Sequence, residues 1–421
     1  MRIRVLPSAT GGEVKAIASK SAAHRLLICA ALAQGDTVIG CEEINEDISA
    51  TVRCLTALGA KIERRNKEYF VSPVRELKRG ALLDCGESGS TMRFLVPVAC
   101  MLGADASFLM SGRLPLRPLS PLREELERCG IEFTPIGSNP LVCKGQLRER
   151  EFSIDGGVSS QFISGLLFAI AASGEGGKVR IKGRLESKPY IDLTADTLGI
   201  FGVKVTKTEN GYEISENGGL LSPKRVEAEG DWSGAAFPLC MGAIGKAPVT
   251  VRGLNRASSQ GEKAIIDILR AMGARVETAD SSVTVFPSSL QGVSVDASQI
   301  PDLVPILAVI ASVAKGRTVI CNAGRLRIKE SDRLMAVRDM LSRLGADVKE
   351  TEDGLSIEGR ERLSGGEVSA YGDHRIVMSA AVAVLRCDSE VVIDGAEAVS
   401  KSYPAFFEDM AELGVVGYTE D

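Results

Sequence analysis

Cationic side chains stand at several predicted helix starts, where the free backbone N–H groups and the helix dipole already favour anions. Capping explains Ser and Asp at such places, but it does not explain Lys or Arg. The cations near these starts are Lys20, Arg25, Arg93, Arg117, Lys329, Arg333, Arg375 and Lys401. Each alone is compatible with a solvated surface position. Together they predict a converging site for an anionic small molecule, because Arg grips phosphate and carboxylate with its fork and Lys with its compact charge.

Two acids lie among these cations. Asp302 follows Pro301 and Glu330 follows Lys329, each at a predicted helix opening. N-terminal capping would also explain both carboxylates. A reaction that moves a proton needs an acid and a base, and neighbouring cations keep carboxylates ionised. Asp302 and Glu330 are therefore catalytic candidates, whereas His374 is equally compatible with hydrogen-bonded packing and is not proposed as catalytic.

Composition excludes several other classes of protein. The 421 residues carry 50 Lys and Arg against 55 Asp and Glu, a net charge of −5, with 5% aromatic residues, which is not the pattern of a nucleic-acid binder. Two histidines and ten widely spaced cysteines without a C-x-x-C pair predict reduced thiols and no metal site. The apolar stretch 300–314 contains an aspartate and is shorter than the roughly 20 residues of a membrane span. We expect a cytoplasmic protein that binds neither membrane nor nucleic acid.

The elements that must position these residues recur six times along the chain. An amphipathic helix ends each time in a glycine, the expected C-terminal cap because it adopts the left-handed conformation without a Cβ clash. These glycines, 69 to 72 residues apart, are Gly59, Gly130, Gly202, Gly273, Gly345 and Gly414. A second, almost wholly apolar helix opens at the same period, near Lys20, Ser90, Ser160, Ser233, Asp302 and Asp373. Short strands are predicted within 36–44, 177–185, 247–255, 317–325 and 389–397, and another within residues 1–7.

Each repeat of about 70 residues is too small to bury a core alone, so the repeats are predicted to pack in threes. The predicted fold class is α/β, with two pseudo-threefold domains of three repeated α/β units each. An open scaffold without chemistry is the alternative, although this period exceeds the roughly 20 to 50 residues of stacked arrays.

An ordered set of motifs resembles one family over essentially the whole chain. The motifs are Ser19–Ser21 with Arg25, Gly86–Arg93, Arg113–Pro118, Ser159–Phe162, Ser187–Tyr190, Lys329–Arg333, Gly372–Arg375 and Lys401–Pro404. Together they resemble the 5-enolpyruvylshikimate-3-phosphate synthases (3-phosphoshikimate 1-carboxyvinyltransferases) of the enolpyruvyltransferase family. The resemblance implies an inside-out α/β barrel type of fold. It also implies an N-terminal domain over residues 15–227, a C-terminal domain over 1–14 and 228–421, and an active site in the cleft between them.

The implied reaction moves the enolpyruvyl group of phosphoenolpyruvate to the 5-hydroxyl of shikimate 3-phosphate, with no metal or organic cofactor, in a monomer. The resemblance assigns phosphoenolpyruvate to Lys20, Gly89, Arg117, Gln161, Arg333, Arg375 and Lys401. It assigns shikimate 3-phosphate to Lys20, Ser21, Arg25, Ser159, Ser160, Gln161, Ser187, Tyr190, Asp302 and Lys329. By the same resemblance Asp302 accepts the hydroxyl proton, and Glu330 or Lys20 protonates the methylene carbon.

Three positions depart from the family's usual pattern. Glu87 stands where Asn is usual and adds a negative charge near the phosphoenolpyruvate residues, Ala18 replaces a glycine, and Phe94 stands where Pro is common. Their effect on affinity for phosphoenolpyruvate or for the inhibitor glyphosate has no predicted direction.

Three rival functions stay open at this point. The enolpyruvyltransferases that act on UDP-N-acetylglucosamine share the six-repeat fold, but they carry Lys-Asn where this chain has Lys20–Ser21 and a cysteine in the loop that here is 111–118. The RNA 3′-phosphate cyclases need a nucleophilic histidine, for which only His374 could serve. A metabolite-binding scaffold would bind the ligands without turnover.

Overall fold

The computed structural model describes residues 1–42, 44–216 and 218–420, which form two compact units. One unit consists of Met1–Ile17 and Glu229–Asp421, and the other of Ala18–Ala228. We call them the terminal unit and the inserted unit. The first boundary lies three residues beyond the one placed from the sequence. Lys15 still pairs with Arg252 in a parallel ladder, and the Ile17 carbonyl accepts a hydrogen bond from the Asp231 N–H at 2.8 Å.

The inserted unit contains three four-stranded sheets of one design. Their orders are β14-β3-β5-β4, β6-β7-β9-β8 and β10-β11-β13-β12. The strands are β3 (Thr37–Gly40), β4 (Lys61–Arg65), β5 (Glu68–Ser72), β6 (Leu82–Asp84), β7 (Ser107–Leu109), β8 (Glu132–Phe133), β9 (Leu141–Lys144), β10 (Glu151–Asp155), β11 (Gly177–Lys182), β12 (Val205–Thr208), β13 (Gly211–Ile214) and β14 (Arg225–Glu227). In each sheet the first pair is parallel and the other two pairs are antiparallel.

The terminal unit repeats this design three more times. Its sheets have the orders β16-β17-β15-β2, β18-β19-β21-β20 and β22-β23-β1-β24. The strands are β1 (Arg2–Leu6), β2 (Gly12–Lys15), β15 (Val249–Arg252), β16 (Val276–Thr278), β17 (Ser282–Val285), β18 (Ser294–Asp296), β19 (Arg317–Cys321), β20 (Asp347–Glu350), β21 (Leu355–Glu358), β22 (Gly366–Ser369), β23 (Val391–Asp394) and β24 (Val416–Glu420). The predicted strands within 1–7, 36–44, 177–185, 247–255, 317–325 and 389–397 are all present.

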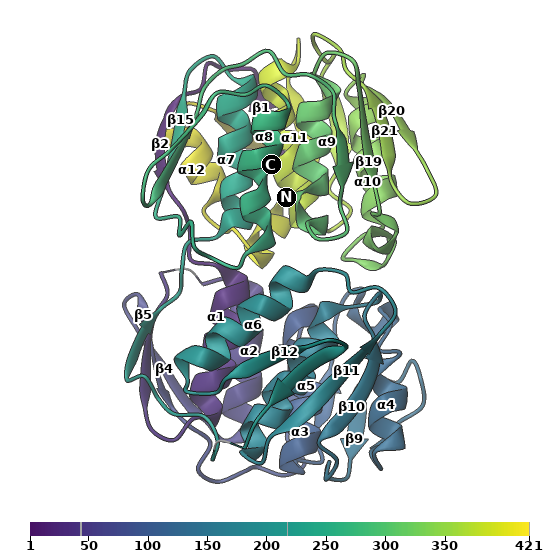
Figure 1. Ribbon diagram of the computed structural model, residues 1–421. Coiled ribbons are helices and arrows are strands. Elements are labelled where there is room, and N and C mark those ends of the chain that lie inside the picture. The colour runs from purple at the N-terminus through teal and green to yellow at the C-terminus, as the bar shows by residue number, and fades with distance from the viewer. Residues whose placement is uncertain (43, 217, 421) are drawn as a thin grey trace. The chain divides into compact units, whose positions relative to one another are not determined.

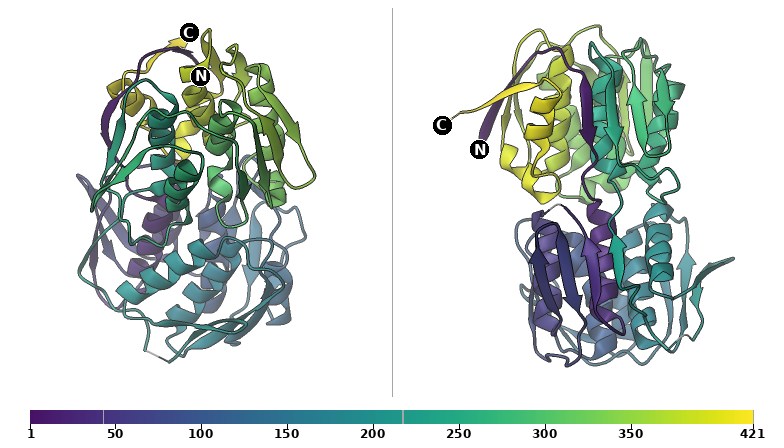
Figure 2. Two further views of the ribbon diagram at one scale, coloured as in Figure 1. Left: turned by 45° about the horizontal axis from the view of Figure 1, so that its top comes forward. Right: turned by 90° about the vertical axis from the view of Figure 1, so that its left-hand side faces the viewer.

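The N-terminal strand completes the last sheet. Strand β1 pairs antiparallel with both β23 and β24, so the two chain ends lie side by side (Figure 2). The register sets Arg2 opposite Asp394 on one side and opposite Glu420 on the other. The predicted strand at the start of the chain is therefore confirmed, and it belongs to the sixth repeat.

Two sets of helices alternate along the chain (Figure 1). The apolar set comprises α1 (Lys20–Leu32), α3 (Gly89–Leu102), α5 (Ser160–Ser173), α7 (Trp232–Ile244), α9 (Val304–Ser312) and α11 (His374–Ala383). The amphipathic set comprises α2 (Glu46–Leu58), α4 (Leu122–Arg128), α6 (Lys188–Ile200), α8 (Ile265–Ala271), α10 (Arg333–Arg343) and α12 (Phe406–Glu412). All six glycines that follow the amphipathic helices have positive φ, between 80° and 120°. The six-fold repeat and its glycine caps are thereby confirmed.

The apolar helices form the core of each unit. Every residue of α7 is buried, whereas α2 buries one face and exposes the other. A helix that is apolar all round is stable in water only when other elements cover it on every side. The sheets and amphipathic helices provide this cover, and the apolar helices are buried inside each unit.

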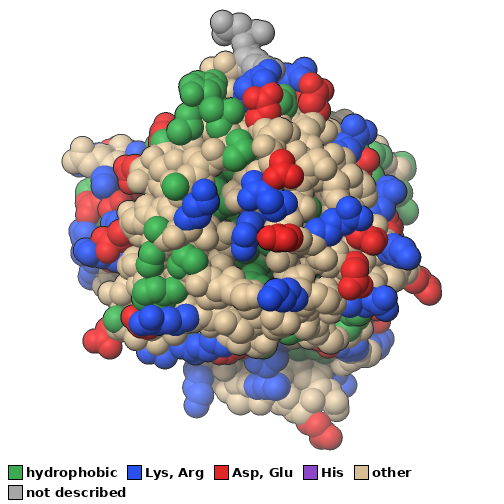
Figure 3. Space-filling model, turned by 90° about the horizontal axis from the view of Figure 1, so that it is seen from above, with side chains coloured by type: hydrophobic (Ala, Val, Ile, Leu, Met, Phe, Trp, Pro, Cys, Tyr) green, Lys and Arg blue, Asp and Glu red, His purple; other side chains and the backbone are tan. Residues whose placement is uncertain are grey.

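The cysteines and the surface bear on the compositional expectations. No disulfide joins the ten cysteines, of which eight are buried and two are half-buried. No helix within the described ranges is long and apolar enough to cross a membrane. On the face of the terminal unit in Figure 3, basic and acidic side chains are interspersed and do not form one basic stripe. The exposed ion pairs of this unit include Arg317–Glu358 at 3.1 Å.

Candidate active site

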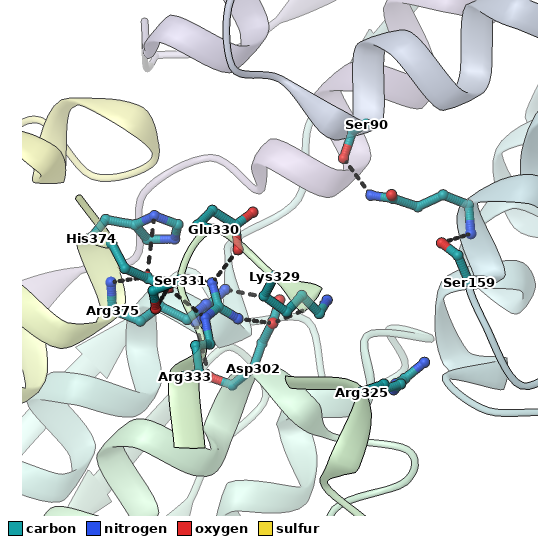
Figure 4. Close-up of polar contacts among 12 residues, drawn as sticks. Ser90, Ser159, Asp302, Arg325, Lys329, Glu330, Ser331, Arg333, His374 and Arg375 are labelled. Carbon is teal, nitrogen blue, oxygen red and sulfur yellow. Dashed lines mark hydrogen bonds and ion pairs between the residues drawn. The ribbon is translucent and has the colours of Figure 1, made fainter. Parts of the chain in front are cut away.

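Arg333 is the centre of a carboxylate cluster in the terminal unit (Figure 4). This first residue of α10 is 2% exposed, and its guanidinium donates to three carboxylates at 2.7 Å each. The acceptors are Asp302 Oδ1, Glu330 Oε2 and Asp373 Oδ2. These carboxylates come from three separate segments of the chain. The predicted site residues Asp302, Glu330 and Arg333 are thus brought together in the terminal unit.

Asp302 binds two arginines and caps no helix. It lies in the 3-10 turn η3 (Pro301–Leu303) before α9, and no side chain caps the N-terminus of that helix. Its Oδ2 accepts from Arg375 Nη2 at 3.1 Å, and its backbone carbonyl accepts from Arg375 Nη1 at 3.1 Å. Because the side chain is 16% exposed, the carboxylate still reaches solvent. Capping therefore does not explain Asp302.

Glu330 is also no cap, because Asp332 accepts the N-cap hydrogen bond of α10 from the Met335 N–H. The Glu330 side chain is 25% exposed and holds one guanidinium nitrogen of Arg333. A carboxylate that is anchored by one oxygen and reachable from solvent has the geometry of a group that can exchange a proton with a ligand.

The ammonium group of Lys329 has a pKa below the usual value for lysine. Burial lowers the pKa of its ammonium to about 8, and Asp302, whose Oδ1 lies 3.8 Å from Nζ, opposes this effect. Arg333 and Arg325 lower the pKa further by like-charge repulsion. A lysine that titrates near neutral pH can lose its charge within the working range of an enzyme.

Asp373 stabilises the cluster from its buried side. It is 0% exposed, accepts from the Arg375 N–H as the N-cap of α11, and binds Ser331 Oγ at 3.1 Å. Burial raises the pKa of Asp373, but the charge and hydrogen bond of Arg333, together with the charge of His374, outweigh burial and hold that pKa below its ordinary value. Burial likewise lowers the pKa of Arg333, and the three carboxylates more than reverse this effect. Asp373 and Arg333 therefore both stay charged around neutral pH.

Lys401 approaches the same region from the C-terminal end of the 3-10 helix η6 (Ala396–Lys401). Its Nζ donates to the Gly372 carbonyl at 2.9 Å, one residue before Asp373. Arg375, the second residue of α11, is 8% exposed at its side chain. The terminal unit thus gathers Lys329, Arg333, Arg375 and Lys401, four of the predicted cations.

The inserted unit holds its own cations at the starts of α1 and α3. Lys20 Nζ forms an ion pair with Asp47 Oδ2 at 2.7 Å, and the two side chains are 20% and 16% exposed. The Arg117 guanidinium lies directly over Gly89, since a Cβ built at Gly89 would be 2.7 Å from Arg117 Nη1. Only glycine admits so close an approach at this position. Arg117 and the Gly89 backbone, both predicted site residues, are therefore neighbours.

Glu87 is exposed and packs against Gly112, whose φ is +54° and whose added Cβ would clash with the Glu87 carboxylate. Phe94, a second departure from the family's usual pattern, is buried at 1% exposure and lies in edge contact with Phe168. Of these two departures, the exposed Glu87 carboxylate is therefore the one that can interact with the charge of a ligand.

Gln161 links two helix starts in the inserted unit. Its Oε1 accepts from Arg93 Nη1 at 2.9 Å. Its Nε2 donates to Ser90 Oγ at 2.8 Å (Figure 4). Ser159 is the N-cap of α5 and accepts from the Gln161 N–H at 3.3 Å, while Ser160 begins the helix and is 5% exposed. These side chains and the α5 N-terminus form a polar surface suited to an anion.

Arg25 is buried at 2% exposure and organises other site residues. It donates to Thr194 Oγ1 at 2.8 Å, to the Ser21 carbonyl at 2.7 Å and to the Tyr190 carbonyl at 2.8 Å. Ser187, which precedes α6, is 2% exposed and has a left-handed φ of 50°. The first turn of α6 is thus fixed by Arg25, which sequence reasoning treated only as a ligand.

Sequence reasoning missed two acids of these clusters. Asp47 was hidden because it lies in the first turn of an amphipathic helix, where acids are common. Asp373 served only as a marker of the repeat, since an N-cap aspartate gives no sign of a second partner 40 residues away. Within the described residues no group of three His, Cys, Asp or Glu side chains is arranged to hold a metal ion.

Known proteins resemble this chain over nearly its whole length. Residues 6–410 match the family described as EPSP synthase (3-phosphoshikimate 1-carboxyvinyltransferase). The 3-phosphoshikimate 1-carboxyvinyltransferases of Clostridium kluyveri and Clostridium perfringens are each 42% identical, over 98% of this chain and 97% and 98% of their own lengths. The solved EPSP synthase of Acinetobacter baumannii is 26% identical with a TM-score of 0.83, covering 100% of both chains. The chain therefore belongs to the EPSP synthase (3-phosphoshikimate 1-carboxyvinyltransferase) family.

Proposed function

We propose that this enzyme transfers the enolpyruvyl group of phosphoenolpyruvate to the 5-hydroxyl of shikimate 3-phosphate and releases phosphate, a step of aromatic amino acid biosynthesis. The observation that carries the proposal is the cluster of Arg333, Arg375 and Lys329 around Asp302 and Glu330. It offers cations for phosphates and carboxylates beside two carboxylates that can move protons. The inserted unit offers a second set of cations and serines.

The substrates are divided among these residues as the family resemblance implies. Phosphoenolpyruvate binds Lys20, Gly89, Arg117, Gln161, Arg333, Arg375 and Lys401. Shikimate 3-phosphate binds Lys20, Ser21, Arg25, Ser159, Ser160, Gln161, Ser187, Tyr190, Asp302 and Lys329. Arg25 contributes further by holding the carbonyls of Ser21 and Tyr190.

The first half of the reaction is an addition. The 5-hydroxyl oxygen attacks C2 of phosphoenolpyruvate while its proton passes to the Asp302 carboxylate, which the ion pairs with Arg333 and Arg375 keep ionised. The methylene carbon C3 takes a proton from Glu330 or Lys20. The product is a tetrahedral intermediate that carries both the phosphate and the new ether.

The second half is an elimination that reverses the proton roles. A proton leaves the new methyl group, the bond between C2 and the phosphate oxygen breaks, and the departing phosphate is protonated. Arg333, Arg375 and Lys401 stabilise the charge that grows on the leaving phosphate. One acid and one base therefore serve both halves.

The test is phosphate release from phosphoenolpyruvate with shikimate 3-phosphate, with UDP-N-acetylglucosamine, and with neither acceptor. Release with shikimate 3-phosphate alone is the expected result. Asp302→Asn and Glu330→Gln should lose most of kcat, whereas Glu358→Gln, an exposed partner of Arg317 on β21, should keep it. Release with the nucleotide sugar would assign the sister reaction, and ligand binding without release would leave a scaffold.

We propose in addition that the enzyme is a cytoplasmic monomer. Ten cysteines without a disulfide fit a reducing compartment. Each unit also buries its own apolar helices, which leaves neither dependent on a second copy. Sedimentation at the concentrations of the assay should give the mass of one chain, 44.6 kDa.

A further inference from the structure

A chain of buried hydrogen bonds joins three helices of the inserted unit. His24 Nδ1 on α1 lies 2.7 Å from Thr51 Oγ1 on α2, which lies 2.6 Å from Thr91 Oγ1 on α3. Thr91 Oγ1 lies 2.8 Å from Ser88 Oγ. All four side chains are 0% or 1% exposed. The reaction proposed above uses none of them.

Both ends of this chain reach residues that are proposed to bind phosphoenolpyruvate. Ser88 is the N-cap of α3 and precedes Gly89, so its hydroxyl sets the turn that presents the Gly89 backbone. At the other end, His24 lies one helical turn after Lys20. Lys20 is paired with Asp47, whose backbone carbonyl also accepts from Thr91 Oγ1 at 3.4 Å. One network therefore touches the supports of both Gly89 and Lys20.

His24 stays neutral at the pH where the enzyme works. Burial lowers the pKa of its imidazole to about 3, Asp47 opposes this effect, and Lys20 and Arg25 add to it. Thr91 has one hydroxyl proton, which it donates to the Asp47 carbonyl, so Thr51 and Ser88 donate to Thr91. The single N–H of the neutral imidazole is therefore on Nδ1 and is donated to Thr51. The network is thus one cooperative unit that involves no charge change.

The second ring nitrogen shows that packing alone does not explain His24. Its Nε2 atom is buried and has no hydrogen-bond partner among the described residues. Such a nitrogen is destabilising, and an apolar side chain of similar size would avoid the penalty. The ring does pack edge-on to Phe94, with centroids 6.5 Å apart, a contact that leucine could replace. What leucine cannot replace is the Nδ1 bond to Thr51.

We infer that His24 is a positioning residue for the reaction, which through Thr51 and Thr91 fixes the Ser88–Gly89 turn and the Lys20 side chain for phosphoenolpyruvate. The inference rests on the proposed function. It predicts a loss in phosphoenolpyruvate binding when the Nδ1 bond is removed. It predicts little change in the binding of shikimate 3-phosphate through Ser159, Ser160 and Lys329.

Steady-state kinetics of matched variants test the inference. His24→Leu removes the bond and keeps the bulk, and Thr51→Val removes it from the other side. His24→Asn keeps a polar atom near the place of Nδ1 and eliminates Nε2. We expect His24→Leu and Thr51→Val to raise KM for phosphoenolpyruvate about tenfold, with KM for shikimate 3-phosphate changed less than about twofold. His24→Asn and Thr51→Ser should restore most of the loss.

Thr197→Val is the control, because Thr197 is a buried threonine of the same unit whose hydroxyl donates within α6, to the Leu193 carbonyl at 2.8 Å. It should leave both KM values unchanged. The double variant His24→Leu/Thr51→Val should be no worse than Thr51→Val alone, since Thr51→Val already removes the bond that His24→Leu removes. Thermal melts of every variant establish that each one is folded before its kinetics are compared.

A second readout does not depend on activity. The chain has two histidines, so nitrogen-15 spectra of the imidazoles can be assigned with His374→Asn alone. His24 should keep a neutral shift pattern from pH 5 to pH 9, whereas a titration in that range would overturn the inference. Unchanged KM values in His24→Leu, or equal rises for both substrates, would overturn it too. A wild-type enzyme without turnover would instead refute the proposed function.

Discussion

Arg333→Gln should destabilise the terminal unit strongly. The guanidinium is 2% exposed and binds three carboxylates, of which Asp302 and Glu330 are 16% and 25% exposed and can be rehydrated. Asp373 is 0% exposed and would be left as a buried charge without its arginine. Breaking a buried ion pair from one side costs about 3–5 kcal/mol. For a unit of this size that loss lowers the melting temperature by roughly 6–20 °C.

Differential scanning calorimetry measures the effect, with Arg343→Gln as the matched control. Arg343 lies on the same helix α10, but its side chain is 55% exposed and pairs with Asp339, so its loss should cost less than about 1 kcal/mol. The double variant Arg333→Gln/Asp373→Asn should regain most of the lost stability. The asparagine can still accept from the Arg375 N–H, and it leaves no unpaired charge.

The pH dependence of the stability provides an independent test. In the wild type Arg333 holds the folded-state pKa of Asp373 below its unfolded value, so this stabilisation is present above about pH 4 and disappears as the pH falls through the folded pKa. Without Arg333, burial is the largest remaining effect and outweighs the charge of His374, so the pKa rises and protonation then favours the folded state. The deficit of Arg333→Gln should therefore shrink between pH 8 and pH 5. A deficit below about 1 kcal/mol, or an equal deficit in the double variant, would refute the reasoning.

Three further predictions concern neighbouring residues. KM for shikimate 3-phosphate should rise above about pH 8 as Lys329 loses its charge. Asp302→Asn should move that rise to lower pH, because Asp302 raises the Lys329 pKa. A KM profile that is flat to pH 10 would contradict this. Glu87→Asn removes an exposed negative charge from the unit that holds Lys20 and Arg117, so KM for phosphoenolpyruvate should fall by about 1.5- to 5-fold, and a rise would count against the placement of that substrate. Gly112→Ala places a Cβ against the Glu87 carboxylate at a φ of +54°, so it should lower the free energy of unfolding, measured by chemical denaturation, by about 1–2 kcal/mol. Gly80→Ala has open space around it and only the strain of a φ of +71°, so it should lower the free energy of unfolding less.

Much of the fold could be predicted because its signals are local. The six glycines cap helices within one turn of the chain, and their positive φ follows from residue type alone. The all-buried composition of α7 requires a central position whatever its neighbours are. The return of β1 to the C-terminal part of the chain is different, because it depends on pairing with β23 and β24 across almost the whole chain, and only the family resemblance predicts it.

The sequence identified the cations of the candidate site but not the acids that pair with them. The cations at helix starts were recognisable because they oppose the local dipole, which made Lys20, Arg333 and Arg375 stand out. Their partners were not recognisable. Asp47 and Asp373 look like ordinary first-turn and capping acids, and the capping interpretation of Asp302 and Glu330 could be rejected only when the actual caps of α9 and α10 were known.

The sequence by itself determined the repeat, the helix caps and the types of group available for chemistry, because each of these depends on residues within a turn or two of one another. Only the tertiary structure decided that Asp302, Glu330 and Asp373 share Arg333, across separations of up to 40 residues, and that Arg375 reaches Asp302 across 73. It also decided the charge states. The pKa values of Lys329 near 8 and of His24 near 3 depend on how far surrounding segments exclude water, and no local pattern carries that information.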